Sequence, residues 1–202
     1  MIILSIVPTN VLYNYELLKE NINSLHKKYN FLDISSIGNS ILGKNIYAIK
    51  LGSGIKKVFY CGSFHANEWI TSVLLMYFIE DYCNCYISNS LLFGYSIQEL
   101  FNSSSIYIVP MVNPDGVDLV TKSLNIEYPS YKNALKISKK FNNIPFPLGW
   151  KSNITGTDLN LQFPAGWENA KKIKYSQGYT SQSPMNYVGS APLTEPEAQA
   201  LY

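Results

Sequence analysis

The feature that most constrains the fold is a strand, helix and strand pattern over residues 57–112. Residues 57–62 form a compact apolar run bounded by turn signals, which predicts a strand buried on both faces. Residues 69–86 are almost wholly apolar and predict a long, largely buried helix. Residues 106–112 predict a second central strand, and Asn-Pro-Asp-Gly at 113–116 predicts a type I turn after it. Two strands joined by a helix make a parallel crossover, so we expect an α/β fold.

Other parts of the chain predict shorter elements. Near the end, Thr194 as N-cap and Glu197 three residues later complete a capping box, which predicts the start of a helix. No internal repeat or long linker is present, so we expect one domain over residues 1–202. The remaining expected elements are a helix over 15–29, strands over 33–37 and 46–51, and one short helix over 131–140 in a mostly irregular stretch, 128–187.

Composition narrows the classes of function. The 202 residues are 47% apolar, carry a formal net charge of +2 and include no arginine, which disfavours disorder and nucleic-acid binding. No uncharged, predominantly apolar run reaches the ~20 residues of a membrane span, and the start lacks the basic region of a signal peptide. We therefore expect a cytoplasmic protein that binds neither nucleic acid nor membrane. Cys61, Cys83 and Cys85 are expected to be reduced packing residues.

The strongest local signal for chemistry is His65 with Glu68, between the first central strand and the helix that follows it. If the helix begins near Ala66, both side chains converge beyond the carboxyl end of the strand, where open α/β sheets place ligands. An imidazole and a carboxylate in this arrangement make two thirds of a catalytic zinc site. The alternative is a strand and helix junction in which Glu68 only favours the helix N-terminus.

Three further polar residues are candidates for the same site. Asp158 and Asn160 alternate along a segment expected to be extended, so their side chains lie on one side of it. The acid could orient a metal-bound imidazole and the amide could hold substrate, or the two could be an ordinary turn-prone pair. Lys151 follows Trp150 and could stabilise an oxyanion, or it could be a solvated lysine. His26 lies beside two lysines and is expected to be solvated.

Five motifs follow one another along the chain: HANEWIT at 65–71, PMVNPDGV at 110–117, WKSN at 150–153, GTDLNLQFPAGWE at 156–168 and APLTEPEAQAL at 191–201. In this order they resemble the zinc carboxypeptidase family, peptidase family M14. Within that family the chain looks like the bacterial γ-D-glutamyl-meso-diaminopimelate peptidases, which cut peptidoglycan stem peptides. The resemblance implies a mixed, mostly parallel central sheet flanked by helices, a Zn²⁺ cofactor and a peptide or muropeptide substrate.

The resemblance also implies roles for individual residues. His65 and Glu68 match the first two zinc ligands, Asp158 matches the acid that orients the histidine ligand, and Asn160 matches a substrate-binding amide. Lys151 stands where digestive carboxypeptidases carry an oxyanion-stabilising arginine, and a point charge does not replace a planar fork of donors.

Two departures from the family pattern modify the expected function. Leu161 replaces the arginine that clamps a terminal carboxylate, which argues against a simple C-terminal exopeptidase. The third zinc ligand, the general base and a substrate-facing tyrosine follow later in the family than this chain extends, so we expect an incomplete catalytic domain. Such a chain should bind zinc weakly and turn over little substrate. The alternatives are a non-catalytic module that binds peptide or muropeptide, and a fragment with exposed apolar strand edges.

Overall fold

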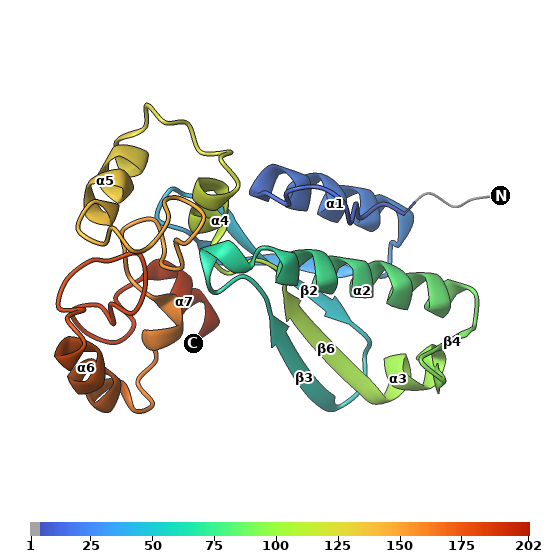
Figure 1. The fold of residues 1–202 in the computed structure, drawn as a ribbon. Coiled ribbons are helices and arrows are strands. Elements are labelled where there is room, and N and C mark those ends of the chain that lie inside the picture. Colours follow the sequence, from blue (N-terminus) through green and yellow to red (C-terminus); the bar gives the residue numbers. More distant parts are fainter. Residues whose placement is uncertain (1–4) are drawn as a thin grey trace.

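The computed structural model describes residues 5–202, and the first four residues of the apolar start lie outside the described part. A sheet with its helices occupies the first 120 residues, and a loop-rich part follows (Figure 1). The main elements are α1 (Tyr15–Lys28), β1 (Asp33–Asn39), β2 (Asn45–Leu51), β3 (Lys56–Cys61), α2 (Ile70–Ile87), β4 (Leu91–Leu92), β5 (Tyr95–Ser96), α3 (Ile97–Ser103), β6 (Ser104–Val109), α4 (Pro114–Val120), α5 (Pro129–Ser138), α6 (Trp167–Ser176) and α7 (Pro196–Leu201).

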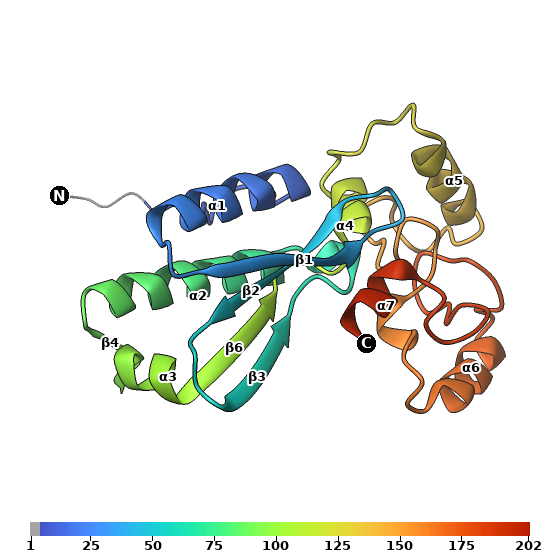
Figure 2. The ribbon, with the colours of Figure 1, turned by 180° about the vertical axis from the view of Figure 1, so that it is seen from behind.

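The central sheet has the strand order β1-β2-β6-β3 and confirms the mixed α/β class (Figure 2). β3 pairs with β6 in parallel, as the strand, helix and strand pattern predicts. β1 with β2, and β2 with β6, pair antiparallel. Within residues 5–202, the central sheet has one parallel and two antiparallel strand pairs, so it is not mostly parallel as expected. β1 and β2 pair antiparallel because they form a hairpin joined by a short turn.

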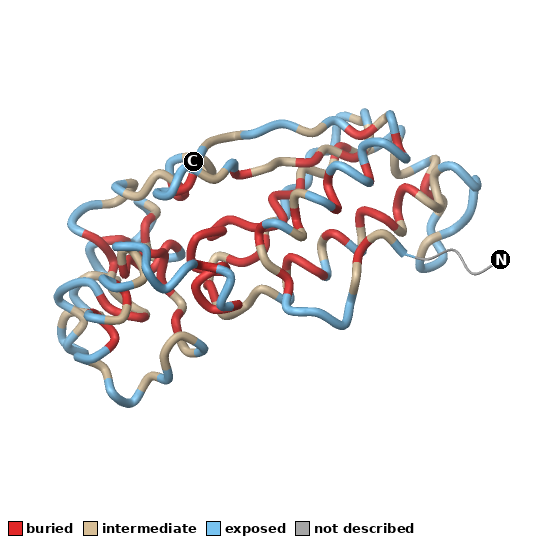
Figure 3. Tube along the Cα trace, turned by 90° about the horizontal axis from the view of Figure 1, so that it is seen from above, coloured by how far each residue is buried: buried red, intermediate tan, exposed pale blue. Residues whose placement is uncertain are grey.

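Successive side chains of β2 point to opposite faces of the sheet. Ile49 and Leu51 belong to one apolar cluster with the buried residues of α1 and α2, which lie along one side of the sheet (Figure 1). Ile46 points to the other face, where it packs in a cluster that includes Leu201 of α7. The longest buried stretch is 108–121, which runs from the end of β6 through α4 (red in Figure 3).

The first central strand differs most from the sequence expectation. β3 is not buried on both faces, since Val58, Phe59 and Tyr60 are 36%, 52% and 49% exposed. The reason is position: within residues 5–202, β3 forms the edge of the sheet and pairs only with β6. α2 is likewise buried on one side only, and Ile70, Leu74 and Tyr77 are exposed on the other.

Several other expectations about local structure are wrong in detail. Residues 113–116 form no isolated turn, because Asn113 caps α4 by accepting a hydrogen bond from the backbone N–H of Gly116. The helix at the end has Glu195 at its N-cap position, and its first turn lacks the expected capping box. The sequence analysis also missed α3, α6 and the small β4–β5 hairpin. Among residues 5–202, no helix is long and apolar enough to cross a bilayer.

Candidate metal and substrate site

The candidate site begins at the end of β3, where the chain leaves the sheet and turns into α2. Gly62 is required there, because a Cβ atom would lie 2.8 Å from the carbonyl oxygen of Pro110. Ser63 has a positive φ of 49° and is held by a hydrogen bond from its backbone N–H to Thr71 Oγ1. This tight turn delivers His65 to the start of a 3-10 turn, Ala66–Glu68, which directly precedes α2.

The structure brings His65 and Glu68 together, as the sequence predicts. The Nδ1 atom of His65 lies 3.1 Å from Oε1 of Glu68. The carboxylate of Glu68 is about half exposed, whereas the imidazole is mostly buried. The two side chains therefore face one point that solvent and a ligand can reach.

Asp158 contacts the other side of the same imidazole. Its Oδ1 atom lies 3.2 Å from Nε2 of His65, and its Oδ2 atom accepts a hydrogen bond from the backbone N–H of Asn186. Asp158 is buried, and its carboxylate also caps the 3-10 turn Leu159–Leu161 by accepting from the Asn160 N–H. The expected extended segment is thus a turn, which directs Asp158 inward and leaves Asn160 exposed.

The two carboxylates raise the proton affinity of the imidazole, and the imidazole lowers that of Asp158. The pKa of His65 is raised, chiefly by its hydrogen bond with Asp158 and further by the charges of both acids, although burial opposes this. Burial alone would raise the pKa of Asp158, but the hydrogen bond and charge of His65 outweigh it and the pKa is lowered. The geometry thus stabilises a proton on the imidazole beside the buried Asp158 carboxylate.

Lys151 approaches this group from the loop-rich part. Its Nζ lies 3.6 Å from Oε1 of Glu68, and its carbonyl oxygen accepts a hydrogen bond from the Ala66 N–H. The side chains of His65, Lys151, Asp158 and Asn160 line one cavity of about 380 Å³. Leu161, at the position that the resemblance assigns to a carboxylate-clamping arginine, also lines it. The other lining residues, Lys174, Met185 and Asn186, were not predicted from the sequence.

The donor set fits part of a zinc site. Asp158 is placed to accept the Nε2 proton, which leaves Nδ1 free to bind a metal next to the Glu68 oxygen, and zinc accepts both nitrogen and oxygen ligands. Residues 5–202 contain no group of three or more His, Cys, Asp or Glu side chains that could hold a metal ion. The described residues thus offer two ligands and one orienting acid.

The residues predicted to be inert do not line this cavity. His26 is exposed on α1. Cys61, Cys83 and Cys85 are free thiols. Burial raises the pKa of the Cys83 thiol to about 12, so it remains protonated at neutral pH. These observations agree with a packing role for Cys83.

Comparisons with known proteins show which family the chain is similar to. The family model described as zinc carboxypeptidase matches residues 18–202. The chain is 42% identical over 192 residues to the γ-D-glutamyl-L-diamino acid endopeptidase 1 of Lysinibacillus sphaericus, covering 94% of this chain and 46% of that protein. It is 38% identical to the Bacillus subtilis (strain 168) protein YqgT, covering 95% of this chain and 50% of that one.

Solved structures show the same fold at lower identity. The bovine thrombin-activatable fibrinolysis inhibitor superposes with a TM-score of 0.64 at 22% identity, covering 94% of this chain and 54% of that one. At this identity the likeness supports the fold alone. The chain spans about half the length of the two curated relatives from L. sphaericus and B. subtilis.

Proposed function

We propose, because this chain belongs to the zinc carboxypeptidase family, that its site takes part in zinc-dependent hydrolysis of peptides. The observation that carries the proposal is the placement of His65 between two carboxylates. Nδ1 faces Glu68 at 3.1 Å, and Nε2 faces the buried Asp158 at 3.2 Å. This is the arrangement in which an imidazole is fixed in one tautomer for metal binding.

The substrate we propose is a γ-D-glutamyl-diamino acid link of a peptidoglycan stem peptide. The name of the L. sphaericus relative describes an endopeptidase for such links. The sequence contains no arginine, so no guanidinium in this chain can clamp a terminal carboxylate, and the aliphatic Leu161 lines the cavity. Both features favour cleavage within a peptide over removal of its last residue.

Each residue of the site has a proposed role. His65 and Glu68 bind the metal, and Asp158 holds the imidazole in place. Bound zinc would polarise the scissile carbonyl and lower the pKa of a bound water to about 7. Lys151, whose Nζ is 3.6 Å from Glu68, is placed to stabilise negative charge on the carbonyl oxygen during hydrolysis. The exposed amide of Asn160 is available to bind the substrate at the cavity wall.

We further propose that complete activity needs groups beyond these 202 residues. A catalytic zinc site of this type uses three protein ligands, and the described residues supply two. The curated relatives are about twice as long as this chain, so they have room for a third ligand and a proton-accepting carboxylate. The 202 residues alone should therefore bind zinc weakly and hydrolyse little substrate.

A second candidate is a module that binds peptide or muropeptide without cutting it. The observation that favours it is the absence of a three-ligand group within residues 5–202. Binding by the walls of the cavity, through Asn160 and Lys151, requires no metal.

Titration with the tripeptide L-Ala-γ-D-Glu-meso-diaminopimelate separates the two candidates. Binding should be measured by calorimetry for the 202-residue chain, with zinc and with a chelator. The peptidase site should lose tripeptide affinity under chelation and in the variants His65→Ala and Glu68→Gln. The matched control is His26→Ala, which changes the only other histidine and should bind like the parent chain.

Hydrolysis of the tetrapeptide L-Ala-γ-D-Glu-meso-diaminopimelyl-D-Ala, in which the γ-linked bond is internal, tests the catalytic part of the proposal. We expect zinc-dependent cleavage of the γ-linked bond, and not of its α-linked isomer, by the complete product of the gene. Tripeptide binding that is unchanged under chelation, with no cleavage by that product, would favour the binding module. Full turnover by the 202-residue chain would contradict the need for further groups.

A further inference from the structure

Charge is distributed unequally along the chain. Residues 128–187, here the basic loop region, contain eight of the sixteen lysines but only two of the fourteen acidic residues. The region thus carries a formal charge of +6, while the rest of the chain carries −4. A surface of this kind attracts anionic ligands before any specific contact forms.

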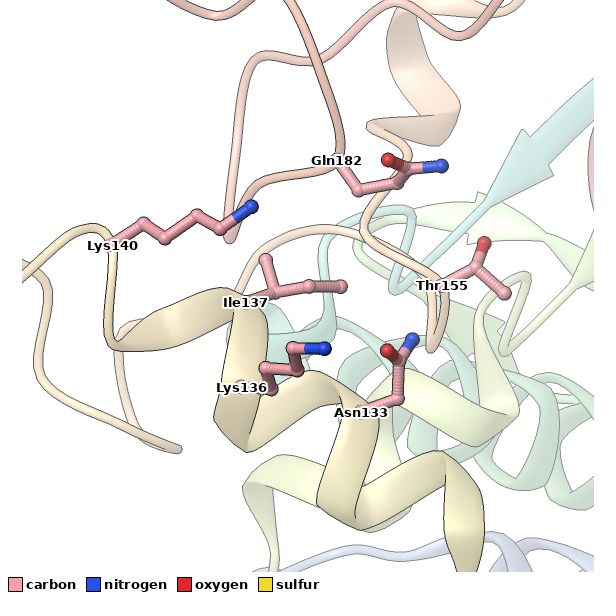
Figure 4. Close-up of a pocket in the computed structure, with 6 residues that line it drawn as sticks. All are labelled: Asn133, Lys136, Ile137, Lys140, Thr155 and Gln182. Carbon is pink, nitrogen blue, oxygen red and sulfur yellow. The ribbon is translucent and has the colours of Figure 1, made fainter.

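The basic loop region contains a cavity separate from the candidate metal site. Its volume is about 350 Å³, near the lower end of the range for small-molecule sites. Figure 4 shows its lining side chains around a common space between α5 and two loops. No acidic side chain is among the lining residues, which are Asn133, Lys136, Ile137, Lys140, Thr155 and Gln182.

One wall of the cavity is a single face of α5 and the turn that follows it. Asn133, Lys136, Ile137 and Lys140 are spaced by three, one and three residues, so they share one helical face. Ile137 is buried and packs in the apolar cluster around Trp150, which fixes the position of this face. Neither Lys136 nor Lys140 makes an ion pair with an acidic side chain of residues 5–202.

The opposite wall consists of two loops that hold each other in place. The hydroxyl of Thr155 donates to Asn153 Oδ1 at 2.9 Å, and the backbone N–H of Ser183 donates to the carbonyl oxygen of Gly156 at 3.0 Å. Gly156 has a φ of +93°, and a Cβ atom there would lie 3.0 Å from Cβ of Gln182. This close approach makes the wall a formed feature of the fold.

We propose that this cavity binds a ligand with two carboxylates on a short aliphatic stem, such as a glutaryl or an acidic peptide group. Lys136 and Lys140 supply two cationic donors one helical turn apart, and the amides of Asn133 and Gln182 can donate further hydrogen bonds. Ile137 gives the stem an apolar surface between the two lysines. Because the donors are separate side chains and the surface between them is apolar, the cavity suits two spaced carboxylates better than one compact phosphate.

The cavity and the candidate metal site share structural supports. The backbone N–H groups of Lys151 and Ser152 both donate to the carbonyl oxygen of Pro184, two residues after Gln182. Thr155 lies four residues after Lys151 in the same loop. A ligand in the cavity therefore contacts the same two loops that position Lys151, although it uses none of the metal-site side chains.

The test is titration of the 202-residue chain with glutarate in the presence of a chelator, so that neither zinc nor hydrolysis contributes. Binding is followed by calorimetry and by the NMR signals of the Gln182 and Asn133 side-chain amides. The double variant Lys136→Gln with Lys140→Gln should weaken binding at least tenfold. The matched control is Lys139→Gln with Lys172→Gln, which removes the same charge from the same region outside the cavity lining and should change affinity less than twofold.

Each outcome decides for or against the proposal. Selective loss in the cavity variant, with shifts of the two amide signals, supports it. Equal loss in both double variants would show attraction by overall charge and would overturn it, as would the absence of binding at millimolar glutarate. Inorganic phosphate bound as tightly as glutarate, or the neutral glutaramide bound equally well, would overturn the assignment to a dicarboxylate. These results leave the proposed hydrolytic function untouched, because that function depends on His65 and Glu68.

Discussion

The sheet part of the molecule, residues 5–127, and the loop part, residues 128–202, are held together by different forces. The sheet part rests on strand pairing and on an apolar cluster around buried side chains such as Ile49 and Met76. The loop part contains buried polar side chains that hydrogen bond to the backbone, among them Asn153 and Gln162. His65 and Glu68 come from the first part and Asp158 from the second, so the site depends on both.

Gln162 shows how the loop part uses a single polar residue. Its side chain is fully buried. Its Nε2 donates to the carbonyl oxygens of Val188 and Ala191 at 2.6 and 3.2 Å. Its Oε1 accepts from the backbone N–H groups of Thr194 and Glu195 at 2.8 and 3.1 Å. One amide thereby connects the segment before α7 to the 3-10 turn that carries Asp158.

The largest effect on stability is expected when this amide is replaced. Gln162→Leu keeps a similar volume but leaves several buried backbone groups without partners, which should cost about 3–5 kcal/mol of unfolding free energy. Ile49→Val in the sheet part should cost only about 1 kcal/mol. Urea unfolding of both variants measures the contrast. Comparable losses would mean that the loop part depends on apolar packing instead.

A pH-dependent contact joins the two parts and should give the next largest effect. Glu197 of α7 is buried, and its Oε1 accepts from the Ile41 N–H in the turn between β1 and β2 (Figure 2). Burial raises the pKa of Glu197 from 4.5 to about 7. The unfolded chain then releases this proton at lower pH than the folded chain, so the stability contributed by Glu197 is fully present below about pH 4.5 and is lost as pH rises through 7.

The expected loss from Glu197 between pH 5 and pH 8 is roughly 2–3 kcal/mol. Unfolding free energies at the two pH values measure it. Glu197→Gln should remove this part of the pH dependence, whereas Glu168→Gln, at an exposed acid of α6, should leave it intact. A pH dependence that persists in Glu197→Gln would assign it to other groups.

The variant Asp158→Asn tests whether an acid of the loop part orients His65, the proposed metal ligand from the sheet part. An amide at 158 can present its NH₂ group to the imidazole, so it no longer fixes the tautomer of His65. Zinc affinity should therefore fall about 10- to 100-fold. Asp33→Asn, an exposed acid of β1, is the control. Competition with a chromophoric chelator gives both affinities. An unchanged zinc affinity in Asp158→Asn would separate the loop part from metal binding.

The smallest effect on stability is expected at the edge of the sheet. Phe59→Thr on the exposed β3 should change the unfolding free energy by no more than about 0.5 kcal/mol. The same change should increase solubility, because it removes apolar surface from an unpaired edge. Light scattering at increasing concentration measures this. Ile49→Thr, on the buried β2, should be strongly destabilising, and a large loss from Phe59→Thr would show that β3 is packed.

Local periodicity predicted the longer elements of the sheet part, but not α3, α4 or the β4–β5 hairpin. The spacing of Leu18, Ile22 and Leu25 gives α1, and the apolar runs give β2, β6 and α2. The same kind of run in β3 led to a wrong burial prediction, because a strand's exposure depends on neighbours that are distant in sequence. The expected capping box at Glu197 is absent for a similar reason. The Glu197 carboxylate instead accepts a hydrogen bond from the Ile41 N–H, which is distant in sequence.

The part of the site that is built from residues close together in the sequence could be predicted. His65 and Glu68 are three residues apart and meet as expected. Asp158 lies against the histidine as expected, but its turn conformation and its bond to Asn186 depend on loops with no periodic signal. The zinc ion, the metal-binding roles of His65 and Glu68, the roles of Asp158, Lys151 and Asn160 and the cytoplasmic location stay predictions.

The central claim is that His65 Nδ1 and Glu68 share a metal ion while Asp158 holds the Nε2 proton. The most direct measurement is ¹⁵N NMR of the two histidine side chains as zinc is added. We predict that zinc shifts the Nδ1 signal of His65, leaves its Nε2 protonated and does not affect His26. A metal shift at Nε2 of His65, or an equal response from His26, would contradict the account.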